Sequence, residues 1–69
     1  MQQPIVGFHT DEQGDWVAEL RCMHNQHVRH DPPWTIREWV LTEAKRTARL
    51  GETLNCLKCD RGEPFDRTQ

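Results

Sequence analysis

The stretch LRCMHNQHVRHDPPW, residues 20–34, contains one of the three cysteines of this 69-residue chain and three of its four histidines. The other two cysteines lie in LNCLKCDRG, residues 54–62, and are separated by two residues. Two ligands close in sequence, a long insertion and two further ligands are how small proteins usually build a tetrahedral zinc site. We therefore predict one structural Zn²⁺ per chain, bound by Cys22, His24, Cys56 and Cys59.

The two ligand pairs differ in their local geometry. Cys56 and Cys59 have the C-x-x-C spacing of a tight knuckle, in which backbone amides point at the thiolates. Cys22 and His24 are separated by one residue, so if this segment is extended their side chains project to the same side. His27 lies beyond a predicted turn after Cys22 and is a reserve ligand, or else a hydrogen-bond partner of the site.

A chain of 69 residues needs such a site, because a domain this small buries only a modest fraction of its surface. We expect a single zinc-stabilised domain over 1–69, with an ordered core at about 4–61 and a frayed tail at 62–69. The candidate core residues are few: Ile5, Val6, Phe8, Trp16, Val17, Leu20, Val28, Trp34, Ile36, Trp39, Val40, Leu41, Leu50, Leu54, Leu57 and Phe65.

The cysteine count and the N-terminal sequence indicate a compartment. An odd number of cysteines cannot all pair within one chain. MQQPIVGFHTDEQ lacks the basic start and apolar stretch of a signal peptide, and no apolar run approaches the roughly 18 residues of a membrane span. We therefore expect a cytoplasmic protein, where clustered cysteine and histidine bind metal more often than they form disulfides. The net charge of −2 gives no global attraction to nucleic acid or membrane.

Residue periodicity predicts a small α+β fold that resembles a zinc ribbon. Residues 5–22 have the pattern of a β-hairpin, and residues 27–30 can return as a third strand before Pro32 and Pro33 end it. Residues 35–41 are expected to be extended. One short helix then begins at Thr42 as N-cap and ends near Gly51, which suits a left-handed exit.

Neither redox nor hydrolytic chemistry is favoured by the motifs. A thioredoxin-like dithiol opens a helix within a βαβ unit, and the C-terminal position of the Cys56 pair leaves no room for one. Zinc deaminases carry H-x-E and P-C-x-x-C, whereas Gln26 follows His24 here and Asn55 precedes Cys56. Four protein ligands also leave no open position on the metal for a catalytic water.

The run C-x-H-N-Q-H-V-R-H-D-P-P-W, the pair Trp39-Val40 and the run L-N-C-L-K-C-D together resemble a family of small bacterial proteins catalogued only as a domain of unknown function. The resemblance extends from Ile5 to about Asp60, and similar domains also occur beside tellurite-resistance-type methyltransferases. It implies a bacterial, cytoplasmic protein and assigns no activity. Met23 stands where the resemblance leads us to expect glycine.

A looser similarity is to the second metal site of RING-type fingers, in which a C-x-H pair and a later C-x-x-C share one zinc. This similarity implies the same four ligands. The other RING site has no counterpart in the sequence, so ubiquitin-ligase activity is not implied.

The stretch after the predicted ligands is more elaborate than a connector requires. We expect it to bind a protein partner, so that the chain acts as a binding or adaptor module. The candidate contact residues are His27, Arg29, His30, Trp34 and Arg37.

Three alternatives remain open. The chain could bind single-stranded nucleic acid, with Trp34 and Trp39 stacking on bases while Arg29, Arg37 and Arg46 hold phosphates. It could be a metal or redox sensor, or an enzyme that uses the histidine cluster. We expect His9 to be structural in each case.

Overall fold

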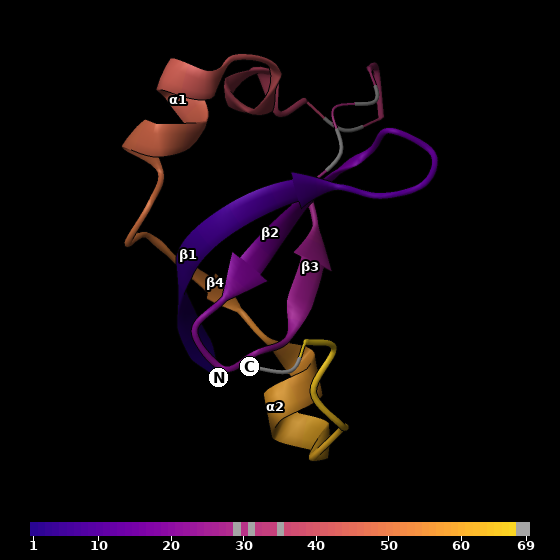
Figure 1. The fold of residues 1–69 in the computed structure, drawn as a ribbon, viewed down its shortest axis with the longest axis vertical. Coiled ribbons are helices and arrows are strands. Elements are labelled where there is room, and N and C mark those ends of the chain that lie inside the picture. Colours follow the sequence, from indigo (N-terminus) through magenta and orange to yellow (C-terminus); the bar gives the residue numbers. More distant parts are fainter. Residues whose placement is uncertain (29, 31, 35, 68–69) are drawn as a thin grey trace.

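The computed structural model describes residues 1–28, 30, 32–34 and 36–67. Its centre is a four-stranded antiparallel sheet in the order β3-β2-β1-β4 (Figure 1). The strands are β1 (Gln2–Thr10), β2 (Trp16–Leu20), β3 (Asn25–His27) and β4 (Thr53–Asn55). Together with its short helices, this sheet confirms the predicted small α+β fold of zinc-ribbon type. The sequence predicted at most three strands and one helix, so β4 and a second α-helix over Leu57–Arg61 are additions.

The long strand β1 joins the two ends of the sequence. Its second half pairs with β2, and its first half pairs with β4 near the other end of the chain. The β1–β2 hairpin is closed by Asp11, whose carboxylate accepts the backbone N–H groups of Gln13 and Asp15, both at 2.9 Å. Gly14 follows with φ of 81°, a conformation that glycine adopts without steric cost.

The helices are short and lie at opposite ends of the sheet (Figure 1). At one end are the 3-10 helix η1 (Glu38–Leu41) and α1 (Glu43–Ala48), and at the other is α2 (Leu57–Arg61). The predicted helix start is confirmed, because Thr42 Oγ1 accepts the N–H of Lys45 at 3.3 Å. Gly51, predicted at the exit, has φ of 90°.

The core contains the three predicted cysteine ligands as well as apolar residues. Its buried members are Ile5, Ala18, Leu20, Val28, Val40 and Cys56, with Phe8, Trp16, Cys22, Trp39, Leu54 and Cys59 packed against them. Arginine side chains cover two of the tryptophan rings. The Arg46 guanidinium lies 3.7 Å from the centre of the Trp16 ring, and that of Arg49 lies 5.0 Å from the centre of the Trp39 ring.

Two predicted extended segments are wrong in position. The third strand covers Asn25–His27 rather than 27–30, because β3 begins directly after a tight turn. Within 35–41, residues 38–41 form η1 instead of an extended segment, and this places Val40 in the core with 1% of its surface exposed.

Both ends of the described chain are joined to the rest of the fold. β1 begins at Gln2, and residues 63–67 make hydrogen bonds to residues 20–25 and to α2. The ordered core at about 4–61 and the frayed tail at 62–69 stay a prediction. Among the described residues, no helix is long and apolar enough to cross a membrane.

Candidate metal centre

Four side chains from two distant parts of the sequence meet beside the sheet. Cys22 and His24 come from the turn between β2 and β3, and Cys56 and Cys59 come from the junction of β4 and α2. One potential ligand atom from each of the four lies within 4.8 Å of all the others. The structure thus brings together the four predicted ligands, in a group that could hold a metal ion.

A three-residue loop positions the first pair. The Leu20 N–H donates to the His24 carbonyl and the Met23 N–H donates to the Leu20 carbonyl, each at 3.0 Å, so Arg21, Cys22 and Met23 form the loop. Met23 has φ of 73°. Hairpin loops of this length often end in a left-handed residue, which is usually glycine. Met23 therefore occupies the position where glycine was expected, and it retains the conformation that favours glycine.

The start of α2 positions the second pair. Cys56 is the N-cap of this helix, and Cys59 is its third residue. Side chains at these two positions lie close together, as they do in a capping box. The Cys56 N–H donates to the Met1 carbonyl at 2.7 Å, which ties the pair to the start of β1. The C-x-x-C spacing thus aims both sulfurs at one point.

The distances within the cluster fit a tetrahedral metal. Zn–S bonds of about 2.3 Å and Zn–N bonds of about 2.0–2.1 Å imply S···S separations of about 3.8 Å and S···N separations of about 3.6 Å. The Sγ atoms of Cys22 and Cys56 are 3.7 Å apart. His24 Nδ1 lies 3.6 Å from Cys56 Sγ and 3.5 Å from Cys59 Sγ. These three of the six separations match the spacing that one ion of this size requires, and all six lie within 4.8 Å.

The imidazole of His24 is held with one nitrogen free for a metal. Its Nε2 donates to the Glu63 carbonyl at 3.0 Å, because a carbonyl oxygen can only accept. The lone pair of a neutral ring then lies on Nδ1, which faces the sulfurs. In the metal-free chain, the Glu63 carbonyl raises the pKa of His24, since it stabilises the imidazolium. His24 is 3% exposed, so the ring is well shielded from water.

Two thiols of the cluster have opposite pKa shifts. Burial raises the pKa of Cys59, and hydrogen bonds with Cys22 and Cys56 help to raise it to about 12. Burial also acts to raise the pKa of Cys22, but hydrogen bonds from the His24 backbone amide and from the Cys59 side chain help to lower it to about 7. The metal-free cluster thus resists carrying three thiolates. A divalent cation would remove that cost, because metal ligation requires the deprotonated form.

The remaining predicted site residues lie outside this cluster. The reserve ligand His27 is exposed, and its Nε2 lies 3.1 Å from Asp11 Oδ2. His30 Nδ1 accepts the Arg37 N–H at 3.0 Å, and Arg37 Nη1 donates to the His27 carbonyl at 3.4 Å. His9, expected to be structural, pairs with Glu19 at 2.6 Å.

Trp34 and Arg29 are the other two residues predicted to contact a partner. The Trp34 side chain is 85% exposed. Arg29 is not among the residues that the structure describes.

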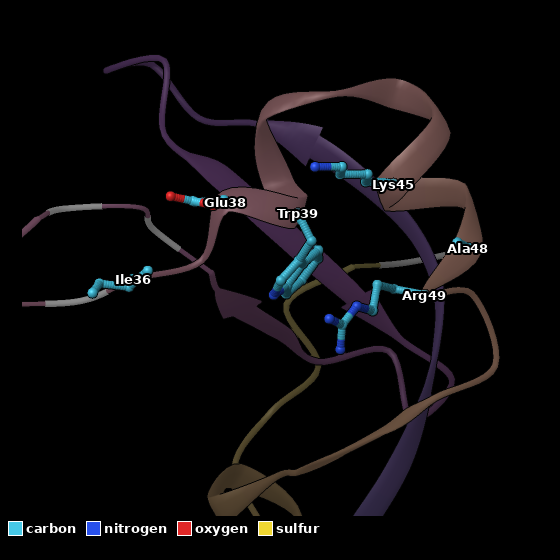
Figure 2. A pocket seen from close by; sticks show the side chains of 6 residues that line it. All are labelled: Ile36, Glu38, Trp39, Lys45, Ala48 and Arg49. Atoms are coloured by element: carbon cyan, nitrogen blue, oxygen red, sulfur yellow. The ribbon is translucent and has the colours of Figure 1, made fainter.

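A shallow groove lies at the other end of the molecule, beside η1 and α1. Figure 2 shows Trp39 and Arg49 next to one another at its centre and Ile36 at its edge. Its volume is about 460 Å³, and it is lined by Ile36, Glu38, Trp39, Lys45, Ala48 and Arg49. Of these lining residues, only Trp39 was predicted to lie on a binding surface. The groove is formed by residues of three different segments, and the sequence does not show that these segments meet.

The sequence interpretation missed the residues that contact His24 from the C-terminal side. Glu63 accepts its Nε2–H, and the Phe65 ring lies 5.7 Å from the His24 ring, centre to centre. Nothing in the sequence EPFDRTQ, residues 63–69, indicates that it contacts His24. One of the two contacts is made by a backbone carbonyl, which every residue type has.

The left-handed turn at Met23 gives the first testable prediction. The free energy of unfolding of Met23→Gly should be roughly 0.5–1 kcal/mol higher than that of Met23→Ala. Both are measured at one fixed concentration of free divalent metal. Both variants lose the side chain, but only glycine relieves a left-handed strain of about 1–2 kcal/mol, partly offset by its larger entropy when unfolded. Urea unfolding followed by tryptophan fluorescence measures the difference. Equal stability, or a more stable alanine variant, would show that the turn carries no strain at this residue.

Comparison with known proteins identifies a family and no activity. No curated protein matches the chain, and no solved structure matches it. A family model described as a protein of unknown function, DUF3565, matches residues 6–63 and so includes all four clustered ligands. This agrees with the resemblance seen in the motifs. The chain therefore belongs to the DUF3565 family of proteins of unknown function.

Proposed function

We propose that this chain is a zinc-stabilised binding module, in which one Zn²⁺ closes the fold and a surface remote from the metal contacts a protein partner. One observation carries the metal part of this proposal. The three sulfurs and the Nδ1 of His24 lie within 4.8 Å of one another, in a chain that has few apolar core residues.

The donor set selects among metals by its chemistry. Calcium and magnesium prefer oxygen ligands, whereas a tetrahedral set of thiolates and imidazole is typical of zinc. Three thiolates and one imidazole fill all four positions, as in structural rather than catalytic zinc sites. When bound, such an ion supplies a cross-link between the β2–β3 turn and the β4–α2 junction. Cys56 and His24, both 3% exposed, would keep one side of it dry.

The binding part of the proposal is supported by apolar side chains that the core leaves outside. Trp34 is 85% exposed and Ile36 is 70% exposed. Ile36 also lines the groove beside Trp39 (Figure 2), at the end of the sheet opposite α2. Exposed aromatic and aliphatic side chains beside a groove are typical of protein–protein contact sites. We further propose that the module works in the bacterial cytoplasm, as the motif resemblance implies.

Single-stranded nucleic acid receives less support as the partner. The Arg46 guanidinium lies over Trp16 and donates to the Val40 carbonyl at 2.6 Å. Arg49 lies near Trp39 and pairs with Glu52 at 3.2 Å. Guanidinium groups that are already engaged within the protein are less available to phosphates, and the chain as a whole is acidic.

The metal assignment predicts different behaviour for two neighbouring histidines. Protein purified without chelator should contain close to one zinc per chain. His24→Ala should leave a labile or empty site, because it opens the fourth position to water. His27→Ala is the matched control, since it removes an imidazole three residues away whose contact is Asp11. Metal analysis and zinc transfer to a chromogenic chelator measure both effects.

Two results would contradict this assignment. If wild-type protein binds no zinc, the metal part of the proposal fails. If His27→Ala empties the site while His24→Ala keeps its metal, His27 is the fourth ligand instead.

The binding role predicts that partner capture depends on the exposed end of the molecule. Immobilised protein should retain a partner from bacterial lysate after nuclease treatment, and Trp34→Ala or Ile36→Ala should abolish retention. Leu57→Ala is the control, because this 53%-exposed leucine lies on α2 at the opposite end. Retention that disappears with nuclease, or falls steeply between about 50 and 200 mM salt, would instead indicate nucleic acid.

A further inference from the structure

We propose that residues 63–67, which we call the C-terminal strap, fix the orientation of His24 and limit the rate at which the metal leaves. This inference rests on the proposed metal site. It assigns roles to Glu63, Phe65, Asp66 and Arg67, three of which lie beyond the part of the chain that the family match covers.

The strap contacts the His24 ring from two directions. The Glu63 carbonyl accepts from Nε2 at 3.0 Å, which selects the tautomer whose Nδ1 faces the three sulfurs. The Phe65 ring lies against the imidazole at 5.7 Å between centres, with an angle of 50° between the planes. A hydrogen bond at one nitrogen and a ring against one face together restrict rotation about the Cβ–Cγ bond. Partners of this kind hold metal-binding histidines in the orientation that the metal requires.

Arg67 secures the backbone of the turn that carries the first ligand pair. Its Nη2 donates to the Leu20 carbonyl at 2.6 Å, and its Nη1 donates to the His24 carbonyl at 2.9 Å. Nη1 also donates to Asn25 Oδ1 at 2.5 Å. The planar guanidinium thus bridges both ends of the loop between β2 and β3. A lysine ammonium would be a poor substitute, because it lacks this rigid fork of donors.

Asp66 ties the strap to both halves of the ligand set. Its carboxylate accepts the Asn25 N–H at 2.8 Å and the Lys58 ammonium at 2.6 Å. Asn25 follows the first pair, and Lys58 lies between the two cysteines of the second pair. The backbone N–H groups of Asp66 and Arg67 both donate to the Met23 carbonyl at 3.1 Å. The strap therefore connects the β2–β3 turn with α2 independently of any metal.

The strap also forms a wall of the opening through which water reaches the ligands. A hollow of about 360 Å³ is lined by Met1, Cys22, His24, Cys59, Gly62, Glu63 and Phe65. Cys22 and Cys59 are half-buried and face this side, whereas Cys56 is buried. This hollow gives a chelator or competing ligand a path to Cys22, His24 and Cys59. Loss of the strap would both widen this approach and free the His24 ring to rotate away.

The test is the rate of zinc release from variants that keep all four ligands. Arg67→Ala and Phe65→Ala should each still bind one zinc at saturating zinc but release it to a chelator about 10- to 100-fold faster than wild type, the range typical for lost partners of metal ligands. Arg67→Lys should restore little of the loss. Arg21→Ala is the control of equal charge in the same turn and should stay within about twofold of wild type.

A second measurement separates positioning from general stability. In long-range nitrogen–proton spectra, the Nε2–H of His24 should exchange with water faster in the strap variants. The amides of Val28 and Val40 in the core should keep their wild-type exchange. Faster exchange at all these sites together would overturn the inference, because it would show that the strap acts only by stabilising the whole fold.

The remaining outcomes distinguish the two proposals. If the wild-type protein holds one zinc and the strap variants release it at the wild-type rate, the proposed role of the strap fails and the metal site stands. Wild-type protein without zinc would overturn the metal site, and the inference with it.

Discussion

Four candidate ligand atoms from distant parts of the sequence converge on one point of the fold, within 4.8 Å of one another. Cys22 and Cys56 are 34 residues apart in sequence, yet their sulfurs are 3.7 Å apart. Ordering a loop of this length costs entropy, and the core that opposes this cost is thin, because the buried cluster contains only six residues in the described chain. One of those six, Cys56, is itself a candidate ligand. The candidate metal site and the hydrophobic core therefore overlap, and under the proposed function a bound ion would supply stability that so small a core lacks.

The rest of the molecule is arranged around this point. β1 pairs with β2 and β4, so a single strand aligns the two segments from which the ligand pairs emerge. At the opposite end, η1 packs into the core through Val40, whereas Ile36 and Trp34 are exposed. This division places the stabilising chemistry at one end and the candidate contact surface at the other. A binding surface can then vary without disturbing the ligands.

The parts of this arrangement that the sequence could predict are those with local signals. Ligand spacing identified the four residues that meet, and the Thr42 cap and Gly51 exit are local features of helix chemistry. The family resemblance led us to expect glycine at position 23, and the structure gives Met23 the positive φ of 73° that glycine favours. By contrast, no short-range pattern indicates that Arg67 reaches the Leu20 carbonyl, because this contact depends on the path of the whole chain. The apolar character of Trp34, Ile36 and Leu57 suggested core positions. Apolarity alone does not distinguish a core side chain from one reserved for a partner, and all three are exposed.

The proposed dependence of folding on the metal is tested most directly by removing the metal. Binding free energies of structural zinc in small domains are about 10–16 kcal/mol, comparable to or larger than the stability of a domain of this size. Excess chelator added to the purified protein should therefore collapse the dispersion of its amide proton–nitrogen spectrum, and added Zn²⁺ should restore it. A metal-free protein that keeps a dispersed spectrum and a cooperative thermal transition would contradict the account.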